Sequence, residues 1–420
     1  MLNTINYILW MNICIILLVF SIKLTIQSNF IQFRFIKIIQ SIFKNKKDKN
    51  EITNFQILMM SLGGKIGVGS ISGIALAIYY GGIGTIFWML IITLVISVFS
   101  FYEVYLGNFF KEIDTNKIYK GGPSYYIKKG LNKKKLSFFY TILIVICYNG
   151  LFLSIQSNTI MKMTNYYYHV NPFFIGICIC LLTILMIYKG VKQIAKISNI
   201  LVPIMIAIYL LLAMFIMYNN LSEITNIFQY IINDAFKIKP FLTSFIPMLI
   251  LTTQRTIFAT ESSLGTSAIA ASTSSSSPTI QGYIQLLGIY ITVFIICLST
   301  TIIIVTTNYQ VLNLNNINGI ELVIYSFNYH FGKFGNTILY VIVLMFCFST
   351  IITGYYNGES SIKSLNIKKI LFLKVITLIA LFIGVIIQAS LLWSITDLLI
   401  GFILIINVYS VYKLRNTVKE

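Results

Sequence analysis

The stretch Ser61-Leu-Gly-Gly-Lys-Ile-Gly-Val-Gly-Ser-Ile-Ser-Gly73 decides the fold of this chain. It lies in an apolar segment that is long enough to cross a bilayer, yet it carries five glycines: Gly63, Gly64, Gly67, Gly69 and Gly73. Each glycine in a helix interior costs roughly 1 kcal/mol relative to alanine. The sequence therefore predicts a local break in a membrane-spanning helix.

Broken backbone at membrane depth is tolerated only where it lines a cavity or is buried in protein. The freed carbonyls can hold a cation there, and the N-terminus of a half-helix can hold a carboxylate. We therefore expect a transporter with its binding site near Gly67 to Gly73. The alternative is that the small residues only allow two helices to pack closely.

Composition points to a membrane protein with many spans. The chain has 420 residues, of which 57% are hydrophobic and only 10% are charged. Runs of about 20 apolar residues recur along it, each sufficient to cross a bilayer as a helix. The six cysteines all fall in apolar segments and resemble neither a metal site nor a disulfide framework. We expect eleven spans, at 6–26, 54–80, 85–108, 138–161, 172–189, 198–218, 241–265, 281–306, 336–357, 367–389 and 391–412.

The net charge of +19 could suggest a nucleic-acid partner, but the placement of the basic residues argues against one. Of the lysines and arginines in the connections, 23 fall on one side of the expected spans and four on the other. This asymmetry is the positive-inside rule. It predicts a multi-pass protein of the cytoplasmic (inner or plasma) membrane, with the N-terminus outside and the C-terminus in the cytoplasm. The partners expected are the lipid bilayer and small solutes, without nucleic acid.

Two connections have unusual composition. Residues 272–278, Ser-Thr-Ser-Ser-Ser-Ser-Pro, are polar and uncharged and are expected to form a flexible connector. Residues 119–131, Tyr-Lys-Gly-Gly-Pro-Ser-Tyr-Tyr-Ile-Lys-Lys-Gly-Leu, predict a turn followed by a short amphipathic piece. That piece is expected to lie along the cytoplasmic membrane interface.

Ionisable groups inside spans are functional candidates, because each costs roughly 2.5–3.5 kcal/mol at the centre of an inserted helix. Glu103 and Lys374 lie toward span ends, where their side chains can reach water by snorkelling. Arg255 and Glu261 lie in a polar interruption of the seventh span that is followed by Gly265, which predicts a second break between these two charged residues, near Phe258 to Thr260. For Arg255 the alternative is a buried ion pair that fixes helix packing. The full set is Lys65, Glu103, Arg255, Glu261, Lys374 and Asp397.

The two expected breaks are regularly placed. Counted from the second span, they fall in elements one and six of ten. This is the pattern of two five-helix inverted repeats, each opening with a discontinuous helix. We therefore expect one transmembrane domain over 1–420, with an extra N-terminal helix (6–26), a first repeat (54–218) and a second repeat (241–412).

Several ordered stretches are similar to the motifs of one known family. Gly67-Val-Gly-Ser-Ile-Ser-Gly73 is similar to Gly-x-Gly-Asn-Ile-x-Gly, and Gly121-Gly-Pro-Ser-Tyr-Tyr-Ile127 to Gly-Gly-Pro-Met-Tyr-Tyr-Ile. Further similar stretches are 81–89, Gln156-Ser-Asn158, 255–270, 348–352, Asn357-Gly-Glu359, and the spacing of Asp397, Gly401 and Asn407. From about residue 30 to 412, the chain resembles the alanine or glycine:cation symporter (sodium:alanine symporter) family, which has the leucine-transporter-type fold.

The resemblance implies an all-α polytopic membrane protein that moves a small neutral amino acid with sodium by alternating access. It implies no enzyme activity and no cofactor, with sodium as the co-transported ion. Amides near Gly69 would hold the substrate carboxylate, and carbonyls near Phe258 to Thr260, with Gln156, would hold its ammonium. Carbonyls near Gly67 and the hydroxyls of Ser349 and Thr350 would hold sodium. The implied substrate-binding residues are Gly67, Gly69, Ser70, Gln156, Phe258, Thr260, Glu261 and Gly354.

The chain departs from the family at positions that bear on coupling. Val68 and Ser70 replace a threonine and an asparagine, so two oxygen-bearing side chains of the family are missing or changed. Gly354 replaces a tryptophan, which predicts a larger substrate pocket. Lys65 and Asp397 are possible coupling residues. The Lys65 ammonium either partly replaces a sodium ion or reaches toward water in the cytoplasmic vestibule.

Other functions stay open at this point. Within transporters, the chain could be proton-coupled, sodium-independent or an exchanger. Outside that class, it could be a substrate-binding receptor that moves no solute, or a leak channel. Saturable uptake against a gradient separates a secondary transporter from the last two.

Overall fold

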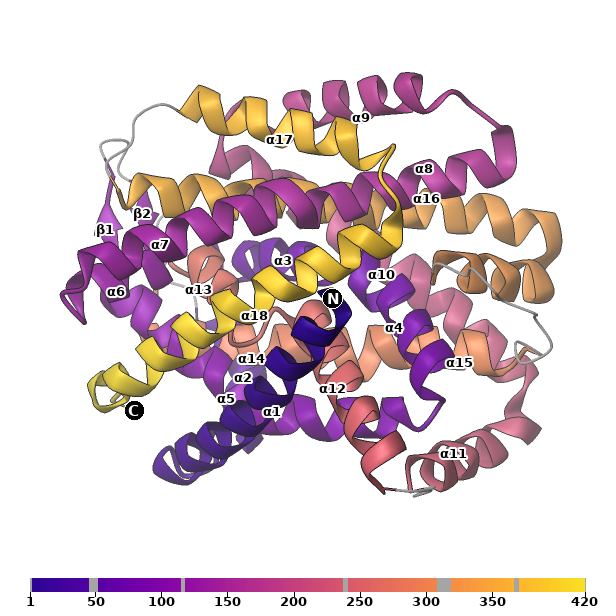
Figure 1. Ribbon diagram of the computed structural model, residues 1–420, viewed down its shortest axis with the longest axis horizontal. Coiled ribbons are helices and arrows are strands. Elements are labelled where there is room, and N and C mark those ends of the chain that lie inside the picture. The colour runs from indigo at the N-terminus through magenta and orange to yellow at the C-terminus, as the bar shows by residue number, and fades with distance from the viewer. Residues whose placement is uncertain are drawn as a thin grey trace.

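The apolar runs of the sequence form helices throughout the computed structural model, which describes residues 2–44, 52–114, 118–236, 241–307, 319–365 and 370–419 (Figure 1). In the first half these are α1 (Leu2–Gln27), α2 (Phe35–Gln40), α3 (Asn54–Lys65), α4 (Val68–Gly81), α5 (Thr85–Phe109), α6 (Pro123–Lys129), α7 (Lys134–Ile144), α8 (Leu153–Tyr168), α9 (Pro172–Ile187) and α10 (Val191–Asn219). In the second half they are α11 (Leu221–Ala235), α12 (Phe241–Thr260), α13 (Thr266–Ala271), α14 (Pro278–Tyr290), α15 (Leu298–Val305), α16 (Ile320–Lys363), α17 (Ile370–Gly384) and α18 (Ala389–Leu414). A small antiparallel hairpin pairs β1 (Glu112–Ile113) with β2 (Tyr119–Lys120).

Two pairs of helices run together as longer rods. A π-helical segment, Val145–Phe152, joins α7 to α8, and a second one, Ile291–Cys297, joins α14 to α15. The long helix α16 contains a kink at Gly332, whose φ of 57° and ψ of −148° are not helical. The expected ninth span, 336–357, lies after this kink.

Among the described residues, seven helices are long and apolar enough to cross a membrane, or eight if the bent pair α3 and α4 is one span. Two shorter apolar helices, α9 and α17, coincide with the expected spans 172–189 and 367–389. The observed chain is therefore all-α and polytopic, as the sequence predicts.

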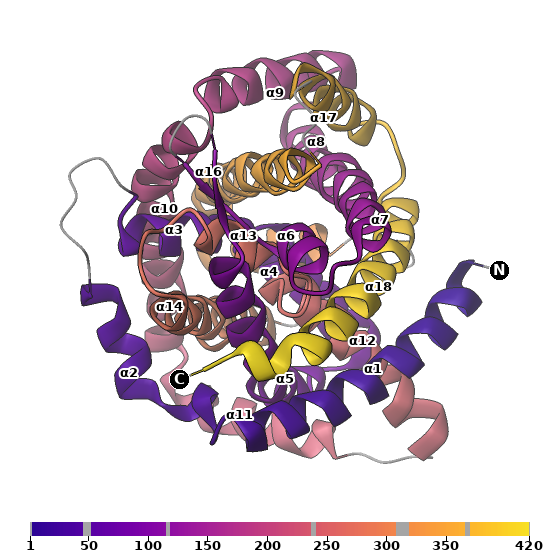
Figure 2. The same cartoon turned by 90° about the vertical axis from the view of Figure 1, so that its left-hand side faces the viewer.

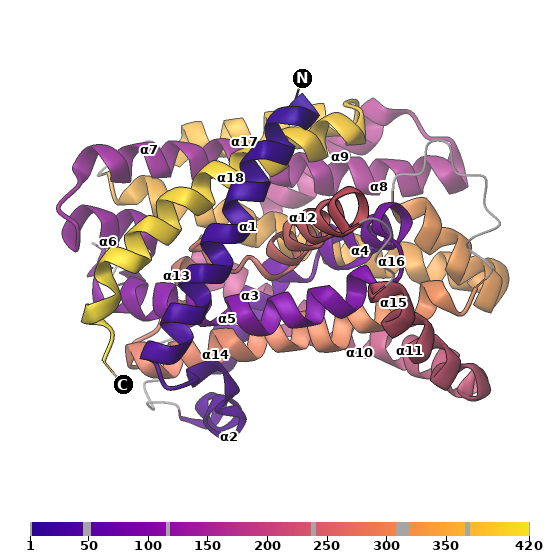
Figure 3. The same ribbon diagram turned by 60° about the horizontal axis from the view of Figure 1, so that its bottom comes forward.

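The broken helices lie at the centre of the molecule. Seen end-on, α3, α4, α13 and α16 lie inside a ring formed by the other long helices, with α9 and α17 at its outer edge (Figure 2). In this centre α3 packs against α10 and α16, and α4 packs against α12 and α16. Helix α1 runs across the outside, alongside α18 (Figure 3), where Trp10 donates its indole N–H to the carbonyl of Asp397 at 3.1 Å.

Two expectations about connections are wrong. The serine-rich segment is ordered and buried, because Ser274 accepts a hydrogen bond from Gln281 at 2.8 Å and Ser276 donates one to Asn54 at 2.9 Å. Helix α6 is not an amphipathic piece with one face free: its residues Pro123–Ile127 are all buried. Both segments pack against other parts of the bundle, a long-range effect that local composition does not show.

The connection 219–240 contains an additional amphipathic helix, α11. Its C-terminal end packs on the turn between α4 and α5, where Asp234 accepts a hydrogen bond from the Gly84 amide at 2.8 Å. Trp88 donates to the carbonyl of Ala235 at 3.0 Å. Position 84 admits no side chain, because a methyl group on Gly84 would lie 2.3 Å from the Ala235 nitrogen.

Candidate functional site

The first break separates α3 from α4 at Ile66 and Gly67, and the two halves are bent by 40°. Ile66 and Gly67 leave the helical region, with ψ values of 80° and −152°. Gly67 is the N-cap of α4 and makes no side-chain cap, so the first amides of α4 need other partners. The predicted discontinuity is confirmed at the predicted glycines.

Four oxygen atoms from α3 and α16 meet beside this break. Ser349 and Thr350 donate their hydroxyls to the carbonyl of Gly63 at 3.1 and 3.0 Å, and to the carbonyl of Phe346 at 2.9 and 3.0 Å. Gly67 lies against the same cluster, since a methyl group in its place would lie 2.2 Å from Oγ1 of Thr350. A cluster of carbonyl and hydroxyl oxygens is the donor set that a small hard cation requires.

The second break, Glu261–Gly265, separates α12 from α13. Glu261, Ser263 and Gly265 have positive φ values of 52°, 67° and 86°. Thr260, the last residue of α12, accepts a hydrogen bond from the Ser262 amide at 3.2 Å. Non-glycine residues rarely adopt such φ values, and they cluster where surrounding structure holds the backbone for function.

The Glu261 carboxylate connects this second break to the first. It accepts a hydrogen bond from Thr266 at 2.9 Å, and a methyl group on Gly64 would lie 3.5 Å from its Oε2. Glu261 is buried. The start of the second break therefore lies beside the last turn of α3, close to the first break.

Phe258 covers the start of α4. A methyl group in place of the Gly69 hydrogen would lie 2.5 Å from Cδ1 of Phe258. The Phe258 ring stacks on Phe152, with centroids 4.6 Å apart, and lies 4.6 Å from the ring of Trp393. Ser70, one residue further along α4, donates its hydroxyl to the Gly67 carbonyl at 3.0 Å. The expected site residues Gly67, Gly69, Ser70 and Phe258 are thus brought together.

Gln156 reaches the same place from α8. Its side-chain carbonyl accepts a hydrogen bond from the Val68 amide at 3.3 Å, and the residue is fully buried. It satisfies one of the free amides at the start of α4. Gln156 is therefore positioned at the first break, where a methyl group on Gly67 would lie 3.4 Å from its Oε1.

Arg255 and Asp397 form an ion pair that links α12 to α18. The Arg255 guanidinium also lies 4.6 Å from the ring centroid of Trp393. The Trp393 ring in turn contacts Phe258, so the ion pair borders the aromatic cover of the site without touching the breaks directly. This matches the alternative for Arg255, a buried ion pair that fixes helix packing.

Comparison with known proteins agrees with this geometry. The whole chain, residues 1–420, matches the sequence model of the sodium:alanine symporter family. The chain belongs to the sodium:alanine symporter family. It is 32% identical to the probable sodium/glutamine symporter GlnT of Bacillus subtilis, over 98% of this chain and 87% of GlnT. It is 31% identical to the amino-acid carrier protein AlsT of the same organism, over 97% of this chain and 88% of AlsT.

A third relative has a lower identity. The chain is 27% identical to the sodium/alanine symporter AgcS of Methanococcus maripaludis, over 99% of this chain and 94% of AgcS. The resemblance inferred from the motifs is therefore confirmed at the level of the family.

In this symporter-family chain, Lys65 and Glu103 are placed differently from the expectation. The Lys65 ammonium donates to Ser61 at 2.6 Å and to the side-chain carbonyl of Gln285 at 2.9 Å, which directs it toward α14. Glu103 does not snorkel to water: it is fully buried and accepts hydrogen bonds from Ser100 at 3.1 Å and Asn407 at 2.9 Å.

Gly354 on α16 faces α8 and the π-helical segment before it. A methyl group in its place would lie 2.8 Å from Cδ2 of Leu153 and 4.0 Å from Cδ1 of Tyr148. These side chains fill the space beside Gly354 in the described structure. The glycine thus allows α16 to approach α8 and its π-helical segment, which argues against the larger substrate pocket expected from the missing tryptophan.

Asn407 is a site-supporting residue whose role the sequence alone does not indicate. Besides Glu103, it donates to the carbonyl of Ser263 at 2.8 Å, inside the second break, and its side-chain carbonyl accepts from Tyr126. The spacing of Asp397, Gly401 and Asn407 was the available signal, but it says nothing of the partners. Trp393 and Gln285 are likewise brought to the site by packing between distant helices.

Proposed function

We propose that this protein is a secondary active symporter that moves a small neutral amino acid together with sodium across the cytoplasmic membrane. The observation that carries the proposal is the meeting of two broken helices at the centre of the bundle, with a carbonyl and hydroxyl oxygen cluster beside the first. The names of GlnT and AgcS support coupling to sodium.

The sodium site we propose consists of the carbonyls of Gly63 and Phe346 and the hydroxyls of Ser349 and Thr350, close to Gly67. A bound cation would draw the lone pairs of these oxygens toward itself, and the hydroxyl hydrogens would turn away from the carbonyls. The oxygens belong to α3 and α16, so the ion would hold these two helices together. A relative movement of α3 would then depend on sodium.

The substrate site we propose lies next to it, at the start of α4 and the second break. Amides near Gly69 would bind the amino acid carboxylate, since a helix N-terminus favours negative charge. Gln156 and the carbonyls from Phe258 to Thr260 would accept hydrogen bonds from its ammonium group, with Glu261 and Ser70 nearby. Phe258 would separate the substrate from one side of the membrane.

The membrane arrangement we propose has eleven spans, with the N-terminus outside and the C-terminus in the cytoplasm. The broken pairs α3–α4 and α12–α13 are the first elements of two five-helix repeats, 54–218 and 241–412, with α1 as the extra helix. The similar positions of the two breaks within these ranges support an inverted repeat of the leucine-transporter type. Alternating access would then move the broken helices against the surrounding scaffold.

Sodium coupling is energetically sufficient for concentrative uptake. A membrane potential of about 100 mV contributes roughly 2.3 kcal/mol for each sodium ion that enters. At 1.36 kcal/mol for each factor of ten, this alone could concentrate a neutral substrate about 50-fold. No covalent step and no cofactor is needed, so we propose that the protein is not an enzyme.

The experiment is uptake of radiolabelled alanine, glycine and glutamine into proteoliposomes, with and without an inward sodium gradient. Glutamine is included because GlnT is named for it. Saturable accumulation that requires sodium supports the proposal. Uptake driven by a proton gradient alone indicates proton coupling, and uptake that requires substrate inside indicates an exchanger. Binding without accumulation indicates a receptor, and unsaturable flux down the gradient indicates a channel.

A further inference from the structure

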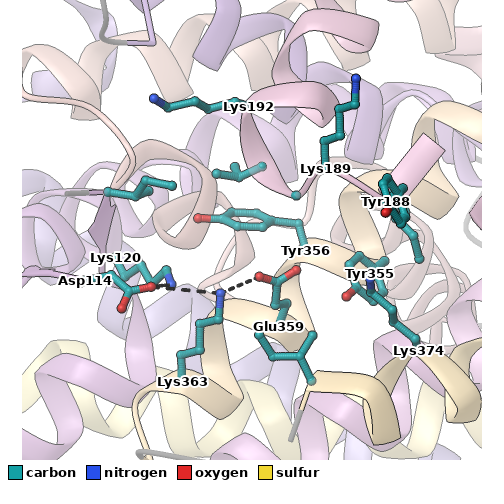
Figure 4. A pocket seen from close by; sticks show the side chains of 15 residues that line it. Asp114, Lys120, Tyr188, Lys189, Lys192, Tyr355, Tyr356, Glu359, Lys363 and Lys374 are labelled. Carbon is teal, nitrogen blue, oxygen red and sulfur yellow. Dashed lines mark hydrogen bonds and ion pairs between the residues drawn. The ribbon is translucent and has the colours of Figure 1, made fainter. Parts of the chain in front are cut away.

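A polar cavity lies at the ends of α9, α16 and α17, apart from the proposed substrate site (Figure 4). Its volume is about 230 Å³. It is lined by the turn between α9 and α10, the C-terminal turns of α16, the first turns of α17 and the β1–β2 hairpin. By the charge asymmetry of the connections, we place this end of the bundle on the cytoplasmic side.

The cavity carries an excess of positive charge. Its lining contains five lysines and two carboxylates: Lys120, Lys189, Lys192, Lys363, Lys374, Asp114 and Glu359. Among the described residues, no arginine or histidine lines the cavity. At neutral pH the cavity therefore presents a net charge of about +3, which favours an anion.

The two carboxylates are already paired with lysines. Lys363 donates to Glu359 at 2.6 Å and lies 4.0 Å from Asp114, which also pairs with Lys120. These four side chains neutralise one another on one side of Tyr356, whereas Lys189 and Lys192 lie on its other side (Figure 4).

Three lysines remain available to a ligand. Within the described residues, no carboxylate lies within 4.0 Å of Lys189, Lys192 or Lys374. Lys374 lies 6.0 Å from the ring centroid of Tyr188. A phosphate group could accept hydrogen bonds from several ammonium groups at once, since each lysine carries three donors.

The surface beside the cavity is apolar. Leu185 and Tyr188 at the end of α9 are 67% and 72% exposed, and Leu371 and Phe372 at the start of α17 are 73% and 66% exposed. Such side chains on the outer edge of a membrane bundle face lipid. The cavity thus combines a positively charged interior with an apolar border, which suits a molecule with a phosphate head and acyl chains.

We propose that this cavity binds the phosphate headgroup of an anionic phospholipid of the cytoplasmic leaflet, with the acyl chains along α9 and α17. Basic pockets between transmembrane helices on the cytoplasmic side bind such headgroups. Because the lipid would contact both helices at the edge of the bundle, it would steady the scaffold against which the broken helices move. This site is separate from the proposed transport site, and only its assignment to the cytoplasmic leaflet rests on the proposed membrane orientation.

The test measures lipid binding to the purified full-length protein in detergent by native mass spectrometry and thermal unfolding. The probes are phosphatidylglycerol, phosphatidylcholine with the same acyl chains, and inorganic phosphate. The variant is Lys189→Ala/Lys192→Ala, both at exposed positions where folding should be kept. The matched control is Lys134→Ala/Lys135→Ala, which removes two lysines from another basic hollow, lined by Asn132–Leu136 and Phe139.

Phosphatidylglycerol is expected to bind the parent and raise its unfolding temperature, while phosphatidylcholine is not. The Lys189→Ala/Lys192→Ala variant should bind phosphatidylglycerol about 25-fold more weakly, roughly fivefold for each lysine, and the control should bind like the parent. Equal loss in both variants, or none in either, would overturn the proposal. Inorganic phosphate that stabilises the parent as well as phosphatidylglycerol, and competes with it, would reassign the cavity to a free phosphate compound.

Discussion

Thr350 on α16 donates its hydroxyl to the carbonyl of Gly63 on α3 at 3.0 Å, beside the point where α3 ends. The same hydroxyl bonds the Phe346 carbonyl at 3.0 Å, and Ser349 repeats both contacts. A bond back to the preceding turn is ordinary for a helical serine or threonine. The contact with Gly63 is different, because it joins two helices that are distant in sequence at the first break.

The first prediction follows from this contact. Thr350→Ala is expected to raise the sodium concentration for half-maximal uptake by about tenfold or more, because a hydrogen-bonding group to a charged species contributes roughly 1.5–3 kcal/mol. Thr350→Ser keeps the hydroxyl and should stay close to the parent. The measurement is the sodium dependence of alanine uptake into proteoliposomes at fixed pH.

The matched control for this prediction is Thr183→Ala on α9. Thr183 is also fully buried and bonds back to the Ile179 carbonyl at 2.8 Å. It thus loses the same kind of intrahelical bond without touching α3. If Thr183→Ala changes the sodium dependence as much as Thr350→Ala does, the oxygen cluster has no specific role in sodium binding.

The second prediction concerns the space above the start of α4. Gly69→Leu is expected to abolish uptake, because its side chain would enter the region between the α4 amides and Phe258. Even a methyl group would lie 2.5 Å from the Phe258 ring. Gly150→Ala is the control, since nothing lies within 4 Å of a methyl group there. Size-exclusion profiles measure folding, and normal uptake by folded Gly69→Leu protein would remove Gly69 from the site.

The sequence alone predicted the place of the first break and the presence of the second, because their causes are local. Glycine is unfavourable in a helix interior, and polar residues between apolar runs disfavour a continuous span. The second break begins later than expected, since α12 stays helical through Thr260 and the chain leaves the helix only at Glu261–Gly265, not near Phe258 to Thr260. The helices that surround the breaks also followed from apolar runs, although several extend beyond the expected limits. For example, the expected span 198–218 is the C-terminal part of α10, Val191–Asn219.

Burial of polar groups between distant helices could not be predicted in this way. Glu103 lies near a span end in the sequence, yet Asn407, 304 positions later, keeps it away from water. The composition of the serine-rich connector predicts flexibility, because the residues that order it, Asn54 and Gln281, belong to α3 and α14. In the sequence, Gly354 suggests free space beside α16, but in the structure the Leu153 side chain faces this glycine. Each of these outcomes depends on long-range packing.

The third prediction separates the substrate from the ion. Gln156→Ala is expected to weaken alanine binding by about tenfold, the effect of losing one hydrogen bond to a charged group, with a smaller change for sodium. Gln156 lies at the proposed substrate site, because its side-chain carbonyl accepts a hydrogen bond from the Val68 amide at the first break. Equilibrium binding of each solute, at a saturating concentration of the other, is the measurement. Equal losses for both solutes would count against a direct substrate contact.

The last prediction concerns the buried ammonium of Lys65. It lies two residues after Gly63 on α3, a rotation of about 200° around the helix axis. Its hydrogen bonds to Ser61 and Gln285 direct it toward α14, whereas the oxygen cluster faces α16. The buried Glu261 carboxylate lies beside the same turn of α3, since a methyl group on Gly64, the neighbour of Lys65, would lie 3.5 Å from its Oε2, and Glu103 is also buried. From this geometry we expect Lys65 to balance buried carboxylates rather than to replace sodium.

Two measurements test this assignment. Uptake by the parent should stop when sodium is replaced by choline at fixed pH, and Lys65→Ala should keep whatever uptake it has strictly dependent on sodium. The variant should also unfold at a lower temperature than the parent, because the buried carboxylates lose their nearby cation. Gln285→Leu removes a hydrogen-bond acceptor of Lys65 but leaves the lysine charge in place. This variant should lower the unfolding temperature less than Lys65→Ala does. Sodium-independent uptake that is present in the parent and absent in Lys65→Ala would show instead that the ammonium takes the place of the ion.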